Sequence, residues 1–427
     1  MILVPGGPGR SGGGPPPTPT LALLHPARPR PASSWLRLNL ASFFPRAQET
    51  VSGPSLRQTF IGPPHPGRPV GPGQPTPSRQ PAMNEPRVRL IVTGDDFGYC
   101  PLRDRGLVEA FLAGALTGVS LLVNGASADT AAQLARRCPD LGWRQRKDPG
   151  KGMRQGQGGA GQGAGPGFPE RLDPRRHGIP AGLHANLSEG RPVSPSLGSR
   201  ASLVGPGGFF LGKMGFRKAL AEGRVLLPEV REELRAQLSR FQNLLGQEPT
   251  HVDGHQHVHV LPGVRQVFAE VLREHGVRYT RVPVEAGLCR CDWLEPQFRT
   301  FALAVEEDAQ AAKEEFEELG LRWPDAYIGL STMGKDMSVS RIEAAIDRAV
   351  ESVLSREDIL QGGRAITMEL MTHPGYPSVS PTSGCGEGPD AFSQSWERLH
   401  ELQTLLDPAL HNSYRQRSIK LCAFEDL

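Results

Sequence analysis

Two segments of the chain carry side chains that could bind a metal ion. Adjacent carboxylates, Asp95 and Asp96, close an apolar run, and residues 251–259 hold four histidines and an aspartate. Together they supply oxygen and imidazole ligands for one divalent cation and leave a spare carboxylate for proton transfer. Core packing explains such residues poorly, because ionised Asp is rarely buried without a partner. The sequence therefore predicts a metal-dependent hydrolase.

The carboxylate pair has two interpretations. At the end of a buried strand, Asp95 and Asp96 would point to opposite sides of the backbone. One would then bind a metal while its neighbour lies near the bound water. The alternative is a helix N-cap, since Asp is favoured there and a helical pattern follows. The pair alone leaves both open.

The histidine run is stronger evidence for a metal. Every second residue from His251 to His259 is polar, which predicts a strand that turns into a loop near Gly254. One or two of these histidines then reach the metal, and the others can hydrogen-bond to its ligands. His184 ends another predicted strand and would complete, with Asp96 and His255, a site of two imidazoles and one carboxylate. By ligand type this site suits zinc, iron or manganese better than magnesium.

His373 is a further candidate for chemistry. Pro374 follows it and favours an extended or turn geometry at a strand end. It is either an ordinary loop histidine or the acid that protonates a leaving group, since imidazole titrates near neutral pH.

Strand and helix patterns alternate from Met83 onward, which predicts a parallel sheet built from βα units. We expect strands at 88–93, 119–124, 179–184, 250–253, 277–282, 326–331 and 365–371. The candidate residues fall where these strands end, as in an α/β barrel, whose active site lies at that rim. No Gly-rich phosphate-binding motif follows a strand, so a nucleotide-binding sheet loses its main support. We expect a distorted (β/α) barrel.

Composition divides the chain. By count, 19 of the 41 prolines lie in residues 1–82, which hold one acidic residue. We expect this extension and a Gly-rich insert at about 139–177 to be disordered, and residues 83–427 to form one catalytic domain around that insert. Residues 1–82 carry a net charge of +7, whereas the whole chain carries +3, so the net charge of the remaining residues is −4. That balance gives no basic face for nucleic acid.

The six cysteines are scattered, apart from one Cys-Arg-Cys, and their spacing predicts reduced thiols rather than disulfides or a zinc site. No apolar run is long enough to span a bilayer, and no convincing signal peptide is present. We expect a cytosolic or nuclear protein. The sequence does not address its oligomeric state.

Four segments in this order resemble the YdjC-like carbohydrate deacetylase family: VTGDDFG (92–98), GLH (182–184), THVDGHQHVH (250–259) and MTHPGY (371–376). EGPDAF (387–392) and WERLHE (396–401) are similar to vertebrate members. The resemblance implies a barrel of the glycoside hydrolase/deacetylase type and removal of acetyl groups from N-acetylated oligosaccharides. It also implies a divalent ion, usually magnesium, on Asp96, His184 and His255, with Asp95 as the proton acceptor.

The chemistry of the residues agrees with that implication. The cation would polarise the acetamide carbonyl and lower the pKa of a water molecule, Asp95 would accept its proton, and His373 would protonate the departing amine. Two departures from the family stand out: Gly94, where alanine is usual, and the insert at about 139–177. They leave open a catalytically impaired protein that binds a sugar or another protein. An esterase or another amidohydrolase with the same metal site is a third hypothesis.

Overall fold

The computed structural model describes residues 88–138, 178–356, 365–379, 384–386 and 388–427. The extension at 1–82 and the insert at 139–177, with the disorder expected for them, lie outside the described residues. So do the domain boundaries drawn from them.

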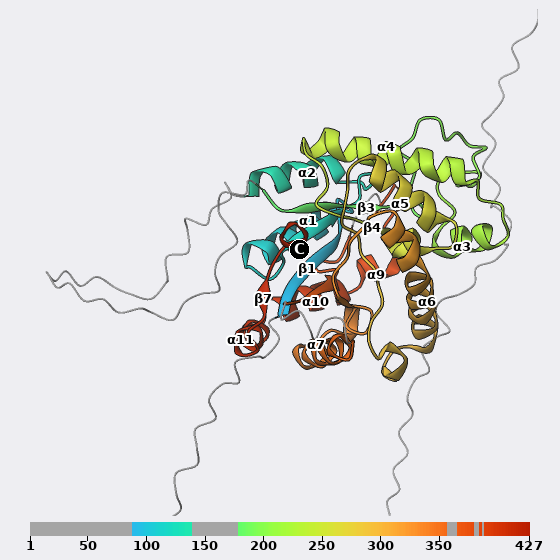
Figure 1. Ribbon diagram of the computed structural model, residues 1–427. Coiled ribbons are helices and arrows are strands. Elements are labelled where there is room, and N and C mark those ends of the chain that lie inside the picture. Colours follow the sequence, from blue (N-terminus) through green and yellow to red (C-terminus); the bar gives the residue numbers. More distant parts are fainter. Residues whose placement is uncertain (1–87, 139–177, 357–364, 380–383, 387) are drawn as a thin grey trace, which may run out of the picture. The chain divides into compact units, whose positions relative to one another are not determined.

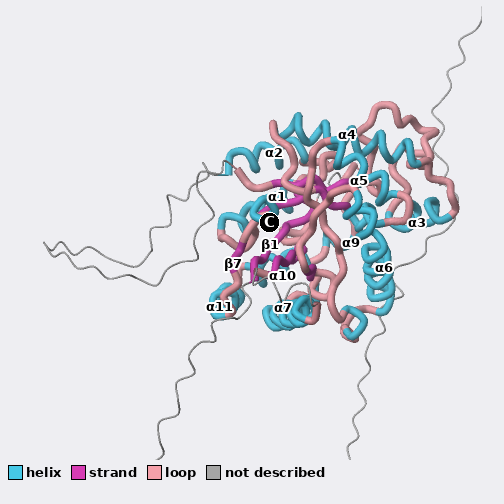
Figure 2. The backbone as a smooth tube through the Cα atoms, in the orientation of Figure 1, coloured by secondary structure: helices cyan, strands magenta, loops and turns pink. Residues whose placement is uncertain are grey.

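A parallel sheet forms the centre of the fold, and helices surround it (Figures 1 and 2). Its strand order is β4-β3-β2-β1-β6-β5, and β7 pairs with the first half of β1. The strands are β1 (Val88–Phe97), β2 (Gly118–Leu121), β3 (Ala181–Ala185), β4 (Val252–Gly254), β5 (Ala326–Ile328), β6 (Ile366–Thr372) and β7 (Lys420–Leu421). The expected α/β architecture with a curled, barrel-like parallel sheet is confirmed.

The helices follow the strands as βα units require. They are α1 (Pro101–Leu112), α2 (Ala128–Arg137), α3 (Lys213–Ala221), α4 (Leu227–Leu245), α5 (Val264–Glu274), α6 (Pro296–Glu318), α7 (Val339–Leu354), α9 (Ala391–Gln394), α10 (Glu397–Leu405) and α11 (Pro408–Gln416). Three-residue and six-residue 3₁₀ turns include η3 (His255–Val260) and η5 (Gly334–Asp336). No described helix has the length and apolar character that crossing a membrane requires.

The expected strand at 277–282 is wrong. Only single bridges form there, from Thr280 to Val252 of β4 and from Tyr279 to Arg322. Pro283 lacks the N–H that a continuing ladder needs, and a third bridge joins Glu285 to Tyr327 of β5. This segment therefore links the two ends of the sheet without becoming a strand, which distorts the barrel.

The core lies between the sheet and the helices. Leu90 and Val92 of β1 are fully buried. The apolar face of α4 that periodicity predicts is buried as well, at Val230, Leu234 and Phe241. The helices are thereby packed against the sheet whose strand ends carry the candidate residues.

Residues on the two sides of 139–177 share one helix cap. Cys138 is the C-cap of α2, Gly178 has φ +98°, and the Ile179 N–H donates to Ala135 O at 2.9 Å. If Gly178 directly followed Cys138, this would be the 6→1 bond of a Schellman motif with glycine at its usual position. The junction between α2 and β3 is therefore built from residues outside 139–177.

A variant that joins Cys138 to Gly178 should fold and unfold at the same or a higher temperature. The cap stays intact, and shortening the loop removes closure entropy equivalent to at most about 3 kcal/mol. Calorimetry on both proteins measures the change. A variant that melts several degrees lower would show that residues 139–177 contribute contacts of their own.

Asp104, in the first turn of α1, fixes the chain just after the carboxylate pair. Its Oδ1 accepts the Gly98 N–H at 2.7 Å, and its Oδ2 accepts the Ser127 hydroxyl at 2.5 Å. Burial raises the pKa of Asp104 to about 7, against the opposing hydrogen bonds. The folded protein therefore holds this proton at a pH where the unfolded chain has lost it.

As pH rises from 5 to 7.5, the unfolding free energy of the wild-type protein should fall relative to that of Asp104→Asn. Between the unfolded pKa of 3.8 and the folded pKa of about 7, the folded state binds more protons, so its unfolding free energy decreases with pH. Asparagine is neutral, its Oδ1 still accepts the Gly98 N–H, and its Nδ2–H donates to Ser127 Oγ, so this dependence disappears. Urea unfolding at pH 5 and 7.5 should show that the unfolding free energy of the wild type decreases by about 2 kcal/mol more than that of Asp104→Asn.

Asp129→Asn is the matched control, because Asp129 is an exposed carboxylate on α2. Its stability should follow the wild-type pH profile. Parallel profiles for wild type and Asp104→Asn would contradict the assignment.

Candidate metal centre

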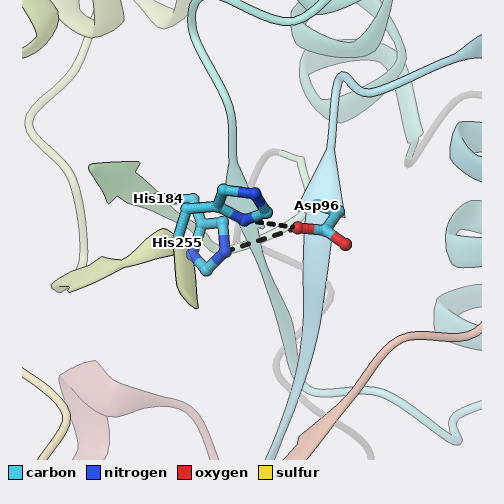
Figure 3. A group of neighbouring side chains, drawn as sticks. All are labelled: Asp96, His184 and His255. Carbon is cyan, nitrogen blue, oxygen red and sulfur yellow. Dashed lines mark ion pairs between the residues drawn. The ribbon is translucent and has the colours of Figure 1, made fainter. Parts of the chain in front are cut away.

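The carboxyl ends of neighbouring strands bring three of the expected residues together. Asp96 lies near the end of β1, His184 near the end of β3, and His255 directly after β4 at the start of η3. All three are buried. Figure 3 shows both imidazoles directed at one oxygen of Asp96.

The backbone at Asp96 turns both neighbouring carboxylates toward this point. Asp96 has φ +63°, in the left-handed region that costs a non-glycine residue energy, and the β1–β2 register shifts between Gly94 and Phe97. Asp95 Oδ2 and Asp96 Oδ1 consequently lie 3.9 and 3.4 Å from the same His184 Nε2. The expectation that the pair points to opposite sides stays a prediction, because it rests on regular strand alternation, which the positive φ of Asp96 interrupts.

Two arginines hold one oxygen of Asp96 and leave the other for the imidazoles. Oδ2 accepts from Arg103 at 2.7 Å and from Arg398 at 3.2 Å. Oδ1 lies 3.4 Å from His184 Nε2 and 3.1 Å from His255 Nδ1. Burial opposes ionisation, but the facing imidazoles and Arg103 outweigh it and hold the pKa of Asp96 well below its usual range.

Asp253 orients His184. Its Oδ1 accepts the Nδ1–H of His184 at 2.7 Å and the Ser120 hydroxyl at 2.6 Å. This bond fixes the ring so that Nε2 faces Asp96, an arrangement typical of histidine ligands. Burial lowers the pKa of His184, but Asp253 and Asp95 outweigh it and raise that pKa to about 10.

Glu189 does the same for His255. Glu189 Oε2 lies 3.2 Å from His255 Nε2, and its Oε1 accepts from the Gln256 side chain. Gln256 and His257 both have positive φ, which ends β4 abruptly and turns the chain as the sequence predicts near Gly254. His255 therefore presents Nδ1 to Asp96.

The donor atoms fit a divalent cation. Asp96 Oδ1, His184 Nε2 and His255 Nδ1 belong to a group whose ligand atoms all lie within 4.8 Å of one another. Asp96 Oδ1 is buried and makes no hydrogen bond, although a buried carboxylate oxygen normally has a partner. A cation would satisfy it, and it would bind the two imidazoles in their neutral form, in place of the protons that the nearby carboxylates favour on them.

A second group with the same spacing consists of Asp95, His184 and Asp253. The guanidinium of Arg281 contacts both of its carboxylates, which disfavours a cation there, although Asp253 Oδ2 also makes no hydrogen bond. Both oxygens of Asp95 accept from Arg281, at 2.6 and 2.8 Å, and Asp253 is shared between His184 and Arg281. The group centred on Asp96 is therefore the better cation site.

Arg281 is the main residue that the sequence analysis missed. It is fully buried, and besides Asp95 it contacts Asp253 Oδ2 at 3.0 Å and Glu369 Oε1 at 2.8 Å. Burial raises the pKa of Asp95 although Arg281 opposes it. The available signal was an arginine in the expected strand 277–282, at alternate spacing from Val277 and Tyr279, because a buried guanidinium requires acidic partners. Arg103, Arg398 and Glu189 gave no comparable signal.

His373 follows β6 and lies beside Asp95. Its Nε2 is 3.9 Å from Asp95 Oδ2, and its carbonyl accepts from Arg398 at 3.2 Å. Burial and the charge of Arg398 hold the pKa of His373 well below its usual range. The structure thus brings all five expected site residues to one place.

The remaining histidines of the 251–259 run support the fold. His251 stacks on Phe424 with ring centroids 4.0 Å apart, and His259 Nε2 hydrogen-bonds to Arg281 O at 2.9 Å. His257 is buried, and burial lowers its pKa well below the usual range. One histidine of the run contacts Asp96, in line with the expectation that few of them reach the site.

Comparison with known proteins places the chain in a family. A family model described as YdjC-like protein matches residues 89–150 and 163–416. The chain is 56% identical to a human protein named carbohydrate deacetylase over 345 residues, which cover 81% of this chain and 93% of the human protein. It is 27% identical to a chitooligosaccharide deacetylase of Serratia marcescens over 340 residues, 79% of this chain and 98% of that protein.

A solved structure shares the fold. The crystal structure of a putative cellobiose-phosphate cleavage protein from Enterococcus faecalis superposes with a TM-score of 0.50 at 20% identity, covering 80% of this chain and 98% of that one. The family model and the 56% identity to the human protein show that the chain belongs to the YdjC-like family.

Proposed function

We propose that this protein is a metal-dependent carbohydrate deacetylase that hydrolyses the acetamide of N-acetylated oligosaccharides. The observation that carries the proposal is the buried Asp96 oxygen without a hydrogen bond, which faces two oriented imidazoles beside a second carboxylate. The names of the human and bacterial relatives supply the substrate class.

Asp96, His184 and His255 would hold the cation. Once bound, it supplies Lewis-acid polarisation of the acetyl carbonyl and makes water more acidic. The family resemblance implies Mg²⁺, whereas two imidazoles and one carboxylate are a donor set of Zn²⁺ or Mn²⁺. Metal analysis of the purified protein distinguishes these ions.

Asp95 is the proton acceptor in this proposal. Its bidentate contact with Arg281 fixes the carboxylate, and burial raises its pKa toward the range where a base works near neutral pH. It takes a proton from the attacking water. Arg281 stabilises the carboxylate before the transfer and keeps it from rotating away.

His373 is the proton donor to the departing amine. Its Nε2 lies 3.9 Å from Asp95 Oδ2, so base and acid flank the same space. The proton removed from water at Asp95 is balanced by the one that His373 gives to nitrogen. The products are acetate and a free amino sugar.

The proposed partner is an acetylated oligosaccharide, with neither nucleic acid nor membrane involved. None of the six cysteines, all in the described part of the chain, forms a disulfide, which suits the reducing cytosol or nucleus.

Acetate release from an acetylated chitooligosaccharide should depend on a metal and on both carboxylates. A chelator should abolish turnover, and a divalent ion should restore it. Asp96→Ala should reduce kcat/KM to background because a ligand is lost, and Asp95→Asn should lower it about 10²- to 10⁴-fold because the base is lost. Coupled acetate detection measures each rate.

Asp129→Asn is again the matched control, because Asp129 is an exposed carboxylate on α2 that pairs with Arg240. It should retain wild-type turnover. Wild-type activity that persists in chelator would refute metal dependence, and turnover of acetate esters alone would favour the esterase hypothesis.

Asp253→Asn should weaken metal binding about 10- to 100-fold, since it removes the charge that orients His184. Calorimetric titration of metal-free protein with Zn²⁺ and Mn²⁺ gives the affinity without any substrate. Asp347→Asn, which removes a surface partner of Arg417, should bind as wild type. Equal affinities for Asp253→Asn and wild type would argue against His184 as a ligand.

A further inference from the structure

Glu401 is a fully buried carboxylate that the proposed mechanism does not yet use. It lies on α10, and its Oε2 accepts the backbone N–H of His373 at 2.5 Å. Its Oε1 accepts the backbone N–H of Gly334 at 2.6 Å. Glu401 thereby joins the loop after β6, which carries His373, to the loop after β5.

The side chain of His373 lies between two carboxylates. Nε2 is 3.9 Å from Asp95 Oδ2, and Nδ1 is 4.0 Å from Glu401 Oε1. Nδ1 is buried and makes no hydrogen bond, which is costly for a polar atom. A ring movement of about 1 Å would bring Nδ1 within hydrogen-bond distance of Glu401.

The charges around His373 show why it needs such a partner. Arg398, one turn before Glu401 on α10, donates to the His373 carbonyl at 3.2 Å. Burial and the positive charges of Arg398 and Arg103 disfavour imidazolium, and Asp96 opposes them. An imidazole that must carry a proton here requires a negative group on its far side. Phe392 covers the ring edge-on, with centroids 6.0 Å apart, and supplies no charge.

We propose that Glu401 is the positioning residue of His373: its carboxylate accepts the Nδ1–H and aims Nε2 at the leaving nitrogen. This inference rests on the proposed function. As the C–N bond breaks, its electron pair goes to nitrogen, the acetyl carbonyl re-forms, and the N–H bond of Nε2 gives its proton to that nitrogen. The other proton stays on Nδ1, hydrogen-bonded to Glu401, so the imidazole ends neutral. The proton held by Asp95 then returns to Nε2 and restores both groups.

Glu397 provides a matched control on the same helix. Its carboxylate accepts the backbone N–H of Lys335 at 3.1 Å, so like Glu401 it holds the loop that contains η5. That hydrogen bond goes to the loop and not to His373. A purely structural role for Glu401 would make the two substitutions resemble each other.

The test combines kinetics with the ring tautomer. Glu401→Gln should lower kcat about 10- to 100-fold with KM nearly unchanged, less than the loss from removing the acid itself. Glu401→Asp should recover part of kcat, and Glu397→Gln should match wild type. Long-range ¹H–¹⁵N spectra, with His373→Gln for assignment, should show Nδ1–H in wild type at pH 8 and lose that preference in Glu401→Gln.

The outcomes separate the two proposals. An unchanged tautomer in a folded Glu401→Gln protein, or a loss of kcat equal to that of Glu397→Gln, would overturn the role of Glu401. If wild type releases no acetate, the proposed function fails. The spectra still decide in that case whether Glu401 orients His373, because they require no substrate.

Discussion

The arrangement of buried charge around Asp96 is the constraint on which the site depends. Arg103 and Arg398 take one carboxylate oxygen, so only the other remains for His184 and His255. Breaking a buried ion pair is strongly destabilising, yet apolar residues in its place are often as stable. Stability alone therefore does not account for so many buried charges. A requirement to present one oxygen in one direction does account for them.

Arg281 extends this constraint to the neighbouring carboxylate. It contacts Asp95, which is the proposed base, and Asp253, which orients His184. One guanidinium thus links the proton acceptor to the proposed ligand shell. A change in the charge at the proposed metal site would therefore act on Asp95 both directly, because its Oδ2 lies 3.9 Å from His184 Nε2, and through Asp253 and Arg281.

Local patterns predicted the candidate site residues but not the residues that hold them. Asp96, His184 and His255 end strands, so the parallel sheet alone brings them together. The arginine partners of the two aspartates could not be assigned in this way, although the position of Arg281 in an expected strand hinted at a buried charge. Arg281 and Arg398 are 186 and 302 residues from Asp95 and Asp96, which they bind. The left-handed backbone at Asp96 was also hidden, since nothing in an apolar strand pattern marks a bulge at its end. The role of Gly178 in the helix cap could not be predicted from the sequence, because residues 139–177 separate it from the helix that it caps.

The environments of the two adjacent aspartates shift their pKa values in opposite directions. Asp96 faces imidazoles and arginine charge, which keep it ionised and suit it to binding a cation. Asp95 is buried with one guanidinium as its main counter-charge, and its pKa is raised. Titratable neighbours whose pKa values are driven apart are typical of sites that divide acid–base roles. Asp96 has a positive φ, and both carboxylates lie close to His184 Nε2. The residue that would hold the cation and the proposed proton acceptor are therefore within the same few ångströms. A water molecule between them would be within reach of Asp95.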